Sequence, residues 1–378
     1  MTNAVAWSKE RSGTDLAMFV PSMRGGGAER AMLKLAIALS RSGVSLDLVL
    51  AMAEGAYVDD IPDDIRLVDL GANRIITSLP SLARYLRANR PDVLLSTLDY
   101  ANVVATWARA LSGTRPRLVL NVQNNMSRAA ADAPYRRGRL VPPLARRTFP
   151  NAAAVVAVSK GVASDLASAI GIPGDIIEVI HNPVVTPELI ARSMEPVEDE
   201  WFAPGSDPVI LAVGRLDTQK DYPTLLESFA SLRARRAVRL MILGEGPLRR
   251  ELESTISRLG LEADVRLPGF VENPFAYMRR CSVYVMSSLY EGLPTVLIEA
   301  LASGARIVST DCPSGPDEIL AGGAYGRLVP MSDSAALEAA IDDAIDDATP
   351  LPGPESWKPY ELNTVVEQYR RVLWGDGR

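Results

Sequence analysis

The sequence predicts an α/β protein built from two Rossmann-like domains, each with a parallel sheet between layers of helices. Short apolar runs alternate with longer helical patterns along the whole chain, as in right-handed βαβ units. These runs are nearly continuous in apolar character, which is typical of strands covered on both faces. The series occurs twice within 378 residues, a length that exceeds one ordinary core.

The expected strands of the first series are 16–20, 46–51, 66–70, 93–97, 118–122, 154–158 and 178–180. Those of the second series are 209–213, 239–243, 264–267, 283–286, 306–309 and 326–329. Between them lies a stretch of prolines and acids without a period. We therefore expect an N-terminal domain at 1–185, a linker at 186–208, a C-terminal domain at 209–355, and a helix within 356–378 that packs back on the first domain.

Composition excludes several classes of protein. With 40 basic and 46 acidic residues, the net charge of −6 gives no support to a nucleic-acid binder. Two isolated cysteines, Cys281 and Cys312, provide neither a zinc motif nor a disulfide framework, so we expect a cytoplasmic chain. Residues 1–13 lack the apolar core of a signal peptide, and no apolar run approaches about 18 residues. The presence of a single histidine, His181, argues against a histidine-based hydrolase or a poly-histidine metal site, and we expect it to be structural or part of a hinge.

One local basic patch stands out against the acidic background. The segment 135–147 reads YRRGRLVPPLARR. It is either a solvated loop and helix face, or a surface that meets anionic lipid headgroups or a polyprenyl-phosphate acceptor at the inner face of a membrane. Its arginines are Arg136, Arg137, Arg139, Arg146 and Arg147.

A glycine-rich turn follows the first expected strand. The residues SMRGGGAER, at 22–30, run into a helix, and Gly25, Gly26 and Gly27 remove side chains where backbone could approach a ligand. The helix start suits a phosphate or a sugar hydroxyl, although a simple tight turn would use the same residues. The spacing does not fit a dinucleotide fingerprint.

The second domain begins with a similar unit. Gly214, Arg215 and Lys220 follow the strand at 209–213, and the two cations could converge on a diphosphate at the carboxyl edge of the sheet. Gly244 begins another glycine-rich turn. The loop 267–274, with Val271 and Asn273, could hold a nucleotide base.

The segment 287–304 is the most informative. A strand leads to a loop with Glu291, whose carboxylate could reach sugar hydroxyls, and then to a helix that contains Glu299. Glu299 lies among apolar residues, so it needs donors, either a ribose diol or backbone amides. The backbone entering this helix would face a diphosphate. That entry comprises Gly292, Leu293, Pro294, Thr295 and Val296. The following loop, 311–319, would border the same pocket, or it is a turn with a helix cap.

These motifs together resemble the retaining glycosyltransferases of the family-four type, which have the GT-B fold. The likeness is carried by GGGAER at 25–30, GRLDTQK at 214–220, EGLPTVLIEALASG at 291–304 and DCPSGPDEIL at 311–320. It implies two domains facing each other across a cleft, with a nucleotide sugar, most often a UDP-sugar, on the second. It also implies that Arg215 and Lys220 neutralise the leaving diphosphate without a metal or cofactor. Glu299 would hold the ribose and Glu291 the transferred sugar.

The sequence departs from that family at one position. Many members have a histidine after the strand that matches 118–122, where this chain has Gln123 and Asn124. These amides, with Gly25–Gly27, would form the N-terminal side of the site. We expect transfer of a hexose or N-acetylhexosamine to a glycan, lipid-linked or polysaccharide acceptor. The alternatives are a catalytically weak nucleotide-sugar-binding module and a nucleotide-sugar 2-epimerase, which would need more histidines.

Overall fold

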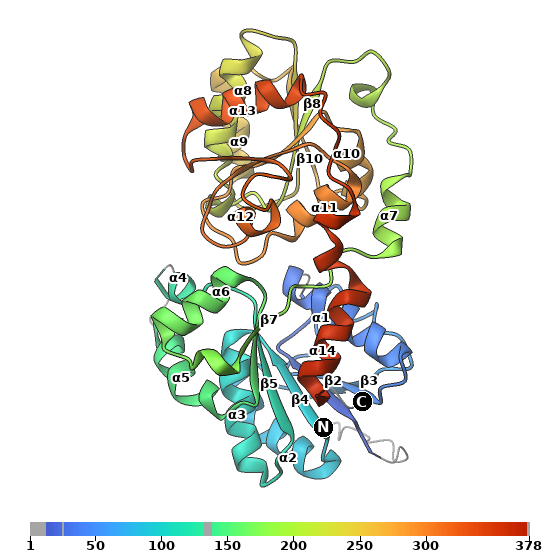
Figure 1. The fold of residues 1–378 in the computed structure, drawn as a ribbon, viewed down its shortest axis with the longest axis vertical. Helices are drawn as coiled ribbons and strands as arrows, with labels where there is room; N and C mark the ends of the chain where they lie inside the picture. Colours follow the sequence, from blue (N-terminus) through green and yellow to red (C-terminus); the bar gives the residue numbers. More distant parts are fainter. Residues whose placement is uncertain (1–12, 25, 132–137, 376–378) are drawn as a thin grey trace. The chain divides into compact units, whose positions relative to one another are not determined.

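The computed structural model describes residues 13–24, 26–131 and 138–375. The chain divides into two compact units. The first comprises Met1–Val156, Leu166–Glu178 and Gln368–Arg378, and the second comprises Ala157–Asp165 and Val179–Glu367. Each unit is an α/β layer structure with one parallel sheet (Figure 1).

The sheet of the first unit has seven strands in the order β3-β2-β1-β4-β5-β6-β7. The strands are β1 (Leu16–Val20), β2 (Leu46–Leu50), β3 (Arg66–Asp69), β4 (Val93–Thr97), β5 (Arg117–Val122), β6 (Ala154–Ala157) and β7 (Ile177–Val179). The main helices connected to it are α1 (Gly27–Arg41), α2 (Leu79–Asn89), α3 (Asp99–Ser112), α4 (Met126–Ala131) and α5 (Val141–Thr148). Strands β1, β2 and β4 are buried along their whole length, which explains why their sequences are mostly apolar.

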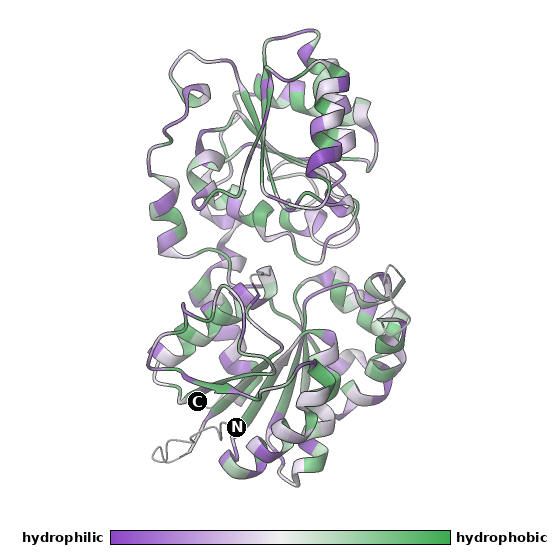
Figure 2. Ribbon diagram, turned by 180° about the vertical axis from the view of Figure 1, so that it is seen from behind, coloured by the Kyte–Doolittle hydropathy of each residue, from purple (hydrophilic) through white to green (hydrophobic). Residues whose placement is uncertain are grey.

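The sheet of the second unit has six strands in the order β10-β9-β8-β11-β12-β13. The strands are β8 (Val209–Val213), β9 (Arg239–Leu243), β10 (Val265–Gly269), β11 (Val283–Met286), β12 (Ile307–Thr310) and β13 (Arg327–Val329). Its helices include α7 (Pro187–Ser193), α8 (Tyr222–Arg233), α9 (Arg249–Leu259), α10 (Pro274–Arg280), α11 (Thr295–Ser303), α12 (Pro316–Ile319) and α13 (Ser334–Ile345). In Figure 2 the strands are mostly hydrophobic, whereas the helices carry both hydrophobic and hydrophilic residues.

Strand order reverses between β8 and β11, which are hydrogen-bonded neighbours although two strands separate them in the sequence. In open parallel sheets, ligands bind beyond the carboxyl ends of the strands at such a switch point. The segments that follow β8 and β11 are therefore the expected place for a ligand-binding site.

The expected linker at 186–208 belongs to the second unit instead. It contains helix α7 and a buried tryptophan, Trp201, which is 3% exposed. The guanidinium carbons of Arg239 and Arg266 lie 5.1 Å and 4.1 Å from the centroid of the Trp201 ring. Arg266 also pairs with Glu200 at 2.6 Å. Contact of one aromatic ring with two cations helps to hold a segment whose prolines and acids predicted a linker.

The C-terminal helix α14 (Leu362–Trp374) is shared between the two units, because the division falls between Glu367 and Gln368. Its Tyr369 hydroxyl accepts a hydrogen bond of 2.8 Å from Asn121 Nδ2 on β5. Arg117 Nε donates to the Val372 carbonyl at 3.0 Å. Within the first unit, the end of α14 is thus tied to β5.

Candidate active site

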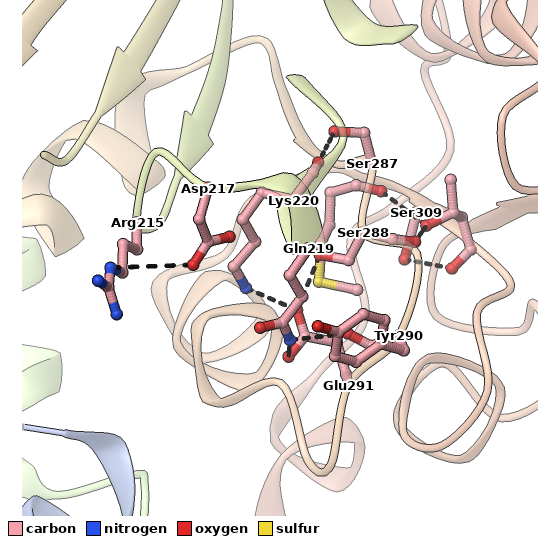
Figure 3. Close-up of polar contacts among 11 residues, drawn as sticks. Arg215, Asp217, Gln219, Lys220, Ser287, Ser288, Tyr290, Glu291 and Ser309 are labelled. Atoms are coloured by element: carbon pink, nitrogen blue, oxygen red, sulfur yellow. Dashed lines mark hydrogen bonds and ion pairs between the residues drawn. The ribbon is translucent and has the colours of Figure 1, made fainter. Parts of the chain in front are cut away.

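An ion pair occupies the switch point of the second sheet. Lys220 ends a short 3-10 turn after β8, and Glu291 follows β11. The Lys220 Nζ atom lies 2.6 Å from Glu291 Oε1, and the two side chains are 15% and 9% exposed. Figure 3 shows that they point toward one another from the two loops. The structure therefore brings together one expected cation and one expected acid.

Glu291 has two further hydrogen-bond donors. Ser288 Oγ donates to Glu291 Oε1 at 2.8 Å, and Gln219 Nε2 donates to Glu291 Oε2 at 3.2 Å (Figure 3). The Ser287 hydroxyl donates to the backbone carbonyl of Lys220 at 2.6 Å, which also joins the two loops. Roles for Gln219, Ser287 and Ser288 were not predicted, because polar residues in loops follow no periodic pattern.

Arg215 lies apart from this pair. Its side chain is 72% exposed, and its Nε atom is 3.9 Å from Asp217 Oδ2. In Figure 3 the guanidinium points away from Lys220 and Glu291. The expected convergence of Arg215 and Lys220 is thus not present in this conformation, although both come from the same loop after β8.

Two glycines let that loop approach its neighbour. Gly244 has φ +142°, and a β-carbon there would lie 2.0 Å from the Gly214 carbonyl oxygen. A β-carbon at Gly214 would lie 3.1 Å from Lys220 Cε. Gly244 is therefore needed for close backbone packing against Gly214, whereas a side chain at Gly214 would press on the side chain of the lysine.

Helix α11 carries Glu299 as its fifth residue, and this side chain is buried at 8% exposure. Leu293 is also buried, and Pro294 takes the N-cap position, so Thr295 and Val296 form the first turn. Burial raises the pKa of Tyr284 well above its usual value, and the charges of Glu299 and Glu291 raise it further. The two carboxylates therefore act on the same buried phenol of β11.

The expected base-binding loop makes other contacts. Asn273 Nδ2 donates to the Arg192 carbonyl at 2.9 Å and to Glu195 Oε2 at 2.7 Å. Both of its amide protons are thus engaged with the region around the end of α7. Val271 is partly exposed.

Among the expected residues of the N-terminal side, Gly25 lies outside the described residues. Gly26 is the N-cap of α1, and Gly27 is its first residue. Gln123 is 5% exposed and its amide donates to Asn121 Oδ1, so it points into the first unit. Asn124 is exposed.

Part of the basic patch is described. Arg139, Arg146 and Arg147 are exposed, next to Leu140 at 56% exposure, whereas Arg136 and Arg137 lie outside the described residues. Within the described ranges, no helix is both long and apolar enough to cross a membrane. The same ranges contain no group of three or more His, Cys, Asp or Glu side chains placed to hold a metal ion.

Comparison with known families matches both halves of the chain. Residues 25–187 match the family described as "Glycosyltransferase Family 4". Residues 194–361 match the family described as "Glycosyl transferases group 1".

Two curated relatives are similar over most of the chain. One is the N-acetylgalactosamine-N,N'-diacetylbacillosaminyl-diphospho-undecaprenol 4-alpha-N-acetylgalactosaminyltransferase of Campylobacter jejuni, 29% identical over 88% of this chain and 90% of the relative. The other is the lipopolysaccharide core biosynthesis glycosyltransferase LpsE of Rhizobium meliloti, 28% identical over 85% of this chain and 86% of the relative.

Solved structures share the fold at lower identity. Anabaena HepE, in a structure with UDP and glucose, has a TM-score of 0.76 and 20% identity over 95% of this chain and 98% of that one. The lipopolysaccharide outer core galactosyltransferase WaaB has a TM-score of 0.74 and 18% identity over 95% and 99%. The matched halves, the named relatives and the two parallel sheets together identify the chain as a glycosyltransferase of the group 1 type with the GT-B architecture.

Proposed function

We propose that the chain is a retaining transferase that moves a hexose or N-acetylhexosamine from a UDP-sugar to a lipid-linked glycan or polysaccharide acceptor. The observation that carries the site is the Lys220–Glu291 pair, at 2.6 Å, at the switch point between β8 and β11. The printed names of the relatives motivate the substrate classes. One relative acts on a diphospho-undecaprenol substrate, and HepE has been solved with UDP-glucose.

In this reaction the bond from the anomeric carbon to the diphosphate breaks, and a bond to the acceptor oxygen forms on the same face. Negative charge builds on the leaving diphosphate, which takes up the proton of the acceptor hydroxyl. Lys220 and the exposed Arg215 stabilise that charge, because preplaced cations lower the energy of such a transition state. We expect no metal requirement, since these cations supply the positive charge.

Glu291 and Glu299 serve different parts of the donor. Glu291, at the end of the β11 loop, contacts the hydroxyls of the transferred sugar. Glu299, five residues into α11, holds the ribose, and the backbone from Gly292 to Val296 faces the diphosphate. Gly214, Gly244 and Val271 border the nucleotide. Asn273 contributes by fixing the loop, given its bonds to Arg192 and Glu195.

A panel of UDP-sugars with a polyprenyl-diphosphate glycan acceptor tests this function. Acceptor-dependent release of UDP that persists in EDTA, with a product of unchanged anomeric configuration by NMR, is the expected result. Interconversion of free nucleotide sugars would identify a 2-epimerase instead. Donor binding without turnover would identify a binding module, the alternative suggested by the inward orientation of Gln123.

We also propose that the arginines of α5 and the preceding turn contact anionic membrane lipid. Arg139, Arg146 and Arg147 are exposed beside the exposed Leu140, which combines charge with an apolar side chain. Sedimentation with phosphatidylglycerol vesicles, but not phosphatidylcholine vesicles, is expected, and Arg146→Glu with Arg147→Glu should weaken it. Equal binding of the wild type to both vesicles would refute the electrostatic contact.

A further inference from the structure

The turn that begins α6 (Lys160–Ser164) contacts two loops at the proposed donor site. Ser159 Oγ accepts from the Val162 N–H at 3.2 Å and donates to the Gly292 carbonyl at 3.1 Å. The backbone N–H of Lys160 donates to Glu318 Oε2 at 2.8 Å. All of these residues belong to the second unit. We call residues 158–161 the crossover turn, because Ala157–Asp165 is flanked in sequence by segments of the first unit.

Backbone packing between the crossover turn and the loop before α12 leaves no room for a side chain at position 161. A β-carbon at Gly161 would lie 2.4 Å from Ser314 Oγ and 3.0 Å from Ser314 Cα. Ser314 itself has φ 68°, a left-handed conformation that costs energy for a residue other than glycine. On the other side, a β-carbon at Gly315 would lie 2.3 Å from Pro294 Cδ. The loop is thus held between the crossover turn and the start of α11.

Glu318 faces the only histidine of the sequence. Its Oε1 atom is buried without a hydrogen-bond partner among the described residues, and His181 Nε2 lies 3.5 Å away. His181 Nδ1 lies 3.0 Å from the Val158 carbonyl oxygen, so Nδ1 must be the donor there. A neutral ring would then turn a lone pair toward the carboxylate. Nε2 and Glu318 can attract each other only if they share one further proton.

A further titratable group packed against His181 is the phenol of Tyr360. The two ring centroids are 4.8 Å apart. Burial raises the pKa of Tyr360, and the charge of Glu318 raises it further, so the phenol stays neutral. It therefore does not replace the proton that the His181–Glu318 contact needs.

We propose that Glu318 is a positioning residue of the transferase. Its carboxylate, held by one proton shared with His181, fixes the position of the crossover turn. Ser159 and Gly161 of this turn contact the loops that position Glu291. This inference rests on the proposed role of Glu291 in donor binding.

The route to Glu291 is short. Gly292, whose carbonyl Ser159 holds, is the next residue in the chain, and the Glu291 N–H lies 3.3 Å from the Pro313 carbonyl oxygen of the loop before α12. Displacement of either loop therefore moves the acid expected to contact the sugar. A misplacement of about 1 Å at a reacting centre can lower a rate by about 100-fold.

Two matched pairs of variants test the kinetic consequence. Glu318→Gln and Asp317→Asn each remove one charge from α12, but Asp317 is exposed. Gly161→Ala and Gly174→Ala each add one methyl, but nothing lies within 4 Å of the new methyl at 174. We expect Glu318→Gln and Gly161→Ala to lower kcat by about tenfold or more with a smaller loss of UDP affinity, and both controls to stay within about twofold. Wild-type kcat in Glu318→Gln and Gly161→Ala would overturn the proposal.

Long-range ¹H–¹⁵N NMR of the imidazole provides a readout that needs no activity, because the sequence has one histidine. In the wild type at pH 7 we expect an Nε2-bound proton or its exchange-averaged sharing with Glu318. In Glu318→Gln we expect the neutral Nδ1–H tautomer, and in Asp317→Asn the wild-type spectrum. A neutral Nδ1–H tautomer in the wild type, unchanged in Glu318→Gln, would overturn the shared proton. Failure of every donor to turn over would instead refute the proposed function while this spectrum still reports the contact.

Discussion

Lys220 Nζ lies 2.6 Å from Glu291 Oε1, so the cation expected to meet a diphosphate is already paired with an acid of the same site. A diphosphate must therefore compete with Glu291 for Lys220. Ser288 and Gln219 also donate to Glu291, and they keep this carboxylate hydrogen-bonded when the lysine turns to another anion. Under the proposed roles, the pair links binding of the donor diphosphate at Lys220 to the orientation of Glu291.

Opposite effects on UDP affinity are expected from the two halves of this pair. Lys220→Met removes the cation. Glu291→Gln removes the negative charge that competes with the diphosphate for Lys220, and it keeps the shape of the Glu291 side chain. We expect Lys220→Met to weaken UDP binding and to lower kcat by about 100-fold or more. Glu291→Gln should preserve or tighten UDP binding while turnover falls. Calorimetry measures both affinities, with Lys358→Met at an exposed lysine as the control. Equal losses of UDP affinity in the two variants would contradict the competition.

The same pair should also affect stability. Breaking a buried ion pair by removal of one partner costs about 3 kcal/mol, because the other charge stays buried. We expect a loss of that order for Lys220→Met, reduced by the remaining donors Ser288 and Gln219. The double variant with Glu291→Gln should be more stable than the sum of the single changes, by about 1 kcal/mol. Urea unfolding measures this coupling, and additive losses would show that the contact contributes nothing.

Arg215→Ala should lower the rate of transfer without a matching loss of folding stability. The Arg215 side chain is 72% exposed, so its removal should change the free energy of unfolding by less than about 0.5 kcal/mol. If the guanidinium turns toward the leaving diphosphate, kcat should still fall by about 100-fold. A normal rate in this variant would remove Arg215 from the reaction.

The two cysteines should resist alkylation in the folded chain. Burial raises the pKa of Cys281 to about 12 and that of Cys312 to about 12, and Glu291 adds to the shift at Cys312 while Lys220 opposes it. The thiolate is the reactive form, so at pH 8 about one thiol in 10⁴ is reactive. We expect slow iodoacetamide labelling that accelerates in urea. Glu291→Gln should make Cys312 more reactive, because it removes a charge that disfavours the thiolate. Mass spectrometry of each cysteine peptide measures the rates, and labelling of the native chain at the rate seen in urea would disprove the burial of these thiols.

Asn121 should contribute more to the stability of the first unit than the exposed Asn124 does. Its side chain hydrogen-bonds to Thr97 at 2.7 Å, to Gln123, and to Tyr369 on α14 at 2.8 Å. Asn121→Leu leaves these buried partners unsatisfied, at about 1–3 kcal/mol each. Hydrogen exchange should then show earlier opening of α14. Asn124→Leu, at an exposed position, is the control, and equal protection of α14 in both variants would contradict the role of Asn121.

Strands were the most predictable elements. Strands buried on both faces give continuous apolar runs, and β1, β4, β8, β9 and β11 have the expected bounds. Other strands differ by one or two residues, as at β10, where a register shift between Arg266 and Gly269 extends the strand into a proline and a glycine. GT-B architecture is confirmed by the two parallel sheets and the structural relatives.

The site was predictable only in part. Lys220 and Glu291 follow neighbouring strands, so their proximity could be expected from the topology. The backbone of Lys160 and the carboxylate of Glu318 meet across 158 residues of sequence, a contact that no local pattern encodes. Trp201 similarly lies in a segment of linker composition, and its burial depends on two distant arginines.

The division of the chain has a practical consequence for dissecting the enzyme. A C-terminal fragment that begins at residue 209 would lose Trp201 and the crossover turn. It would also lose the β-bridge between Val185 and Glu361. Recombinant chimaeras with other transferases should therefore exchange 157–165 and 179–367 together, so that each exchanged unit keeps the contacts that hold its own segments in place.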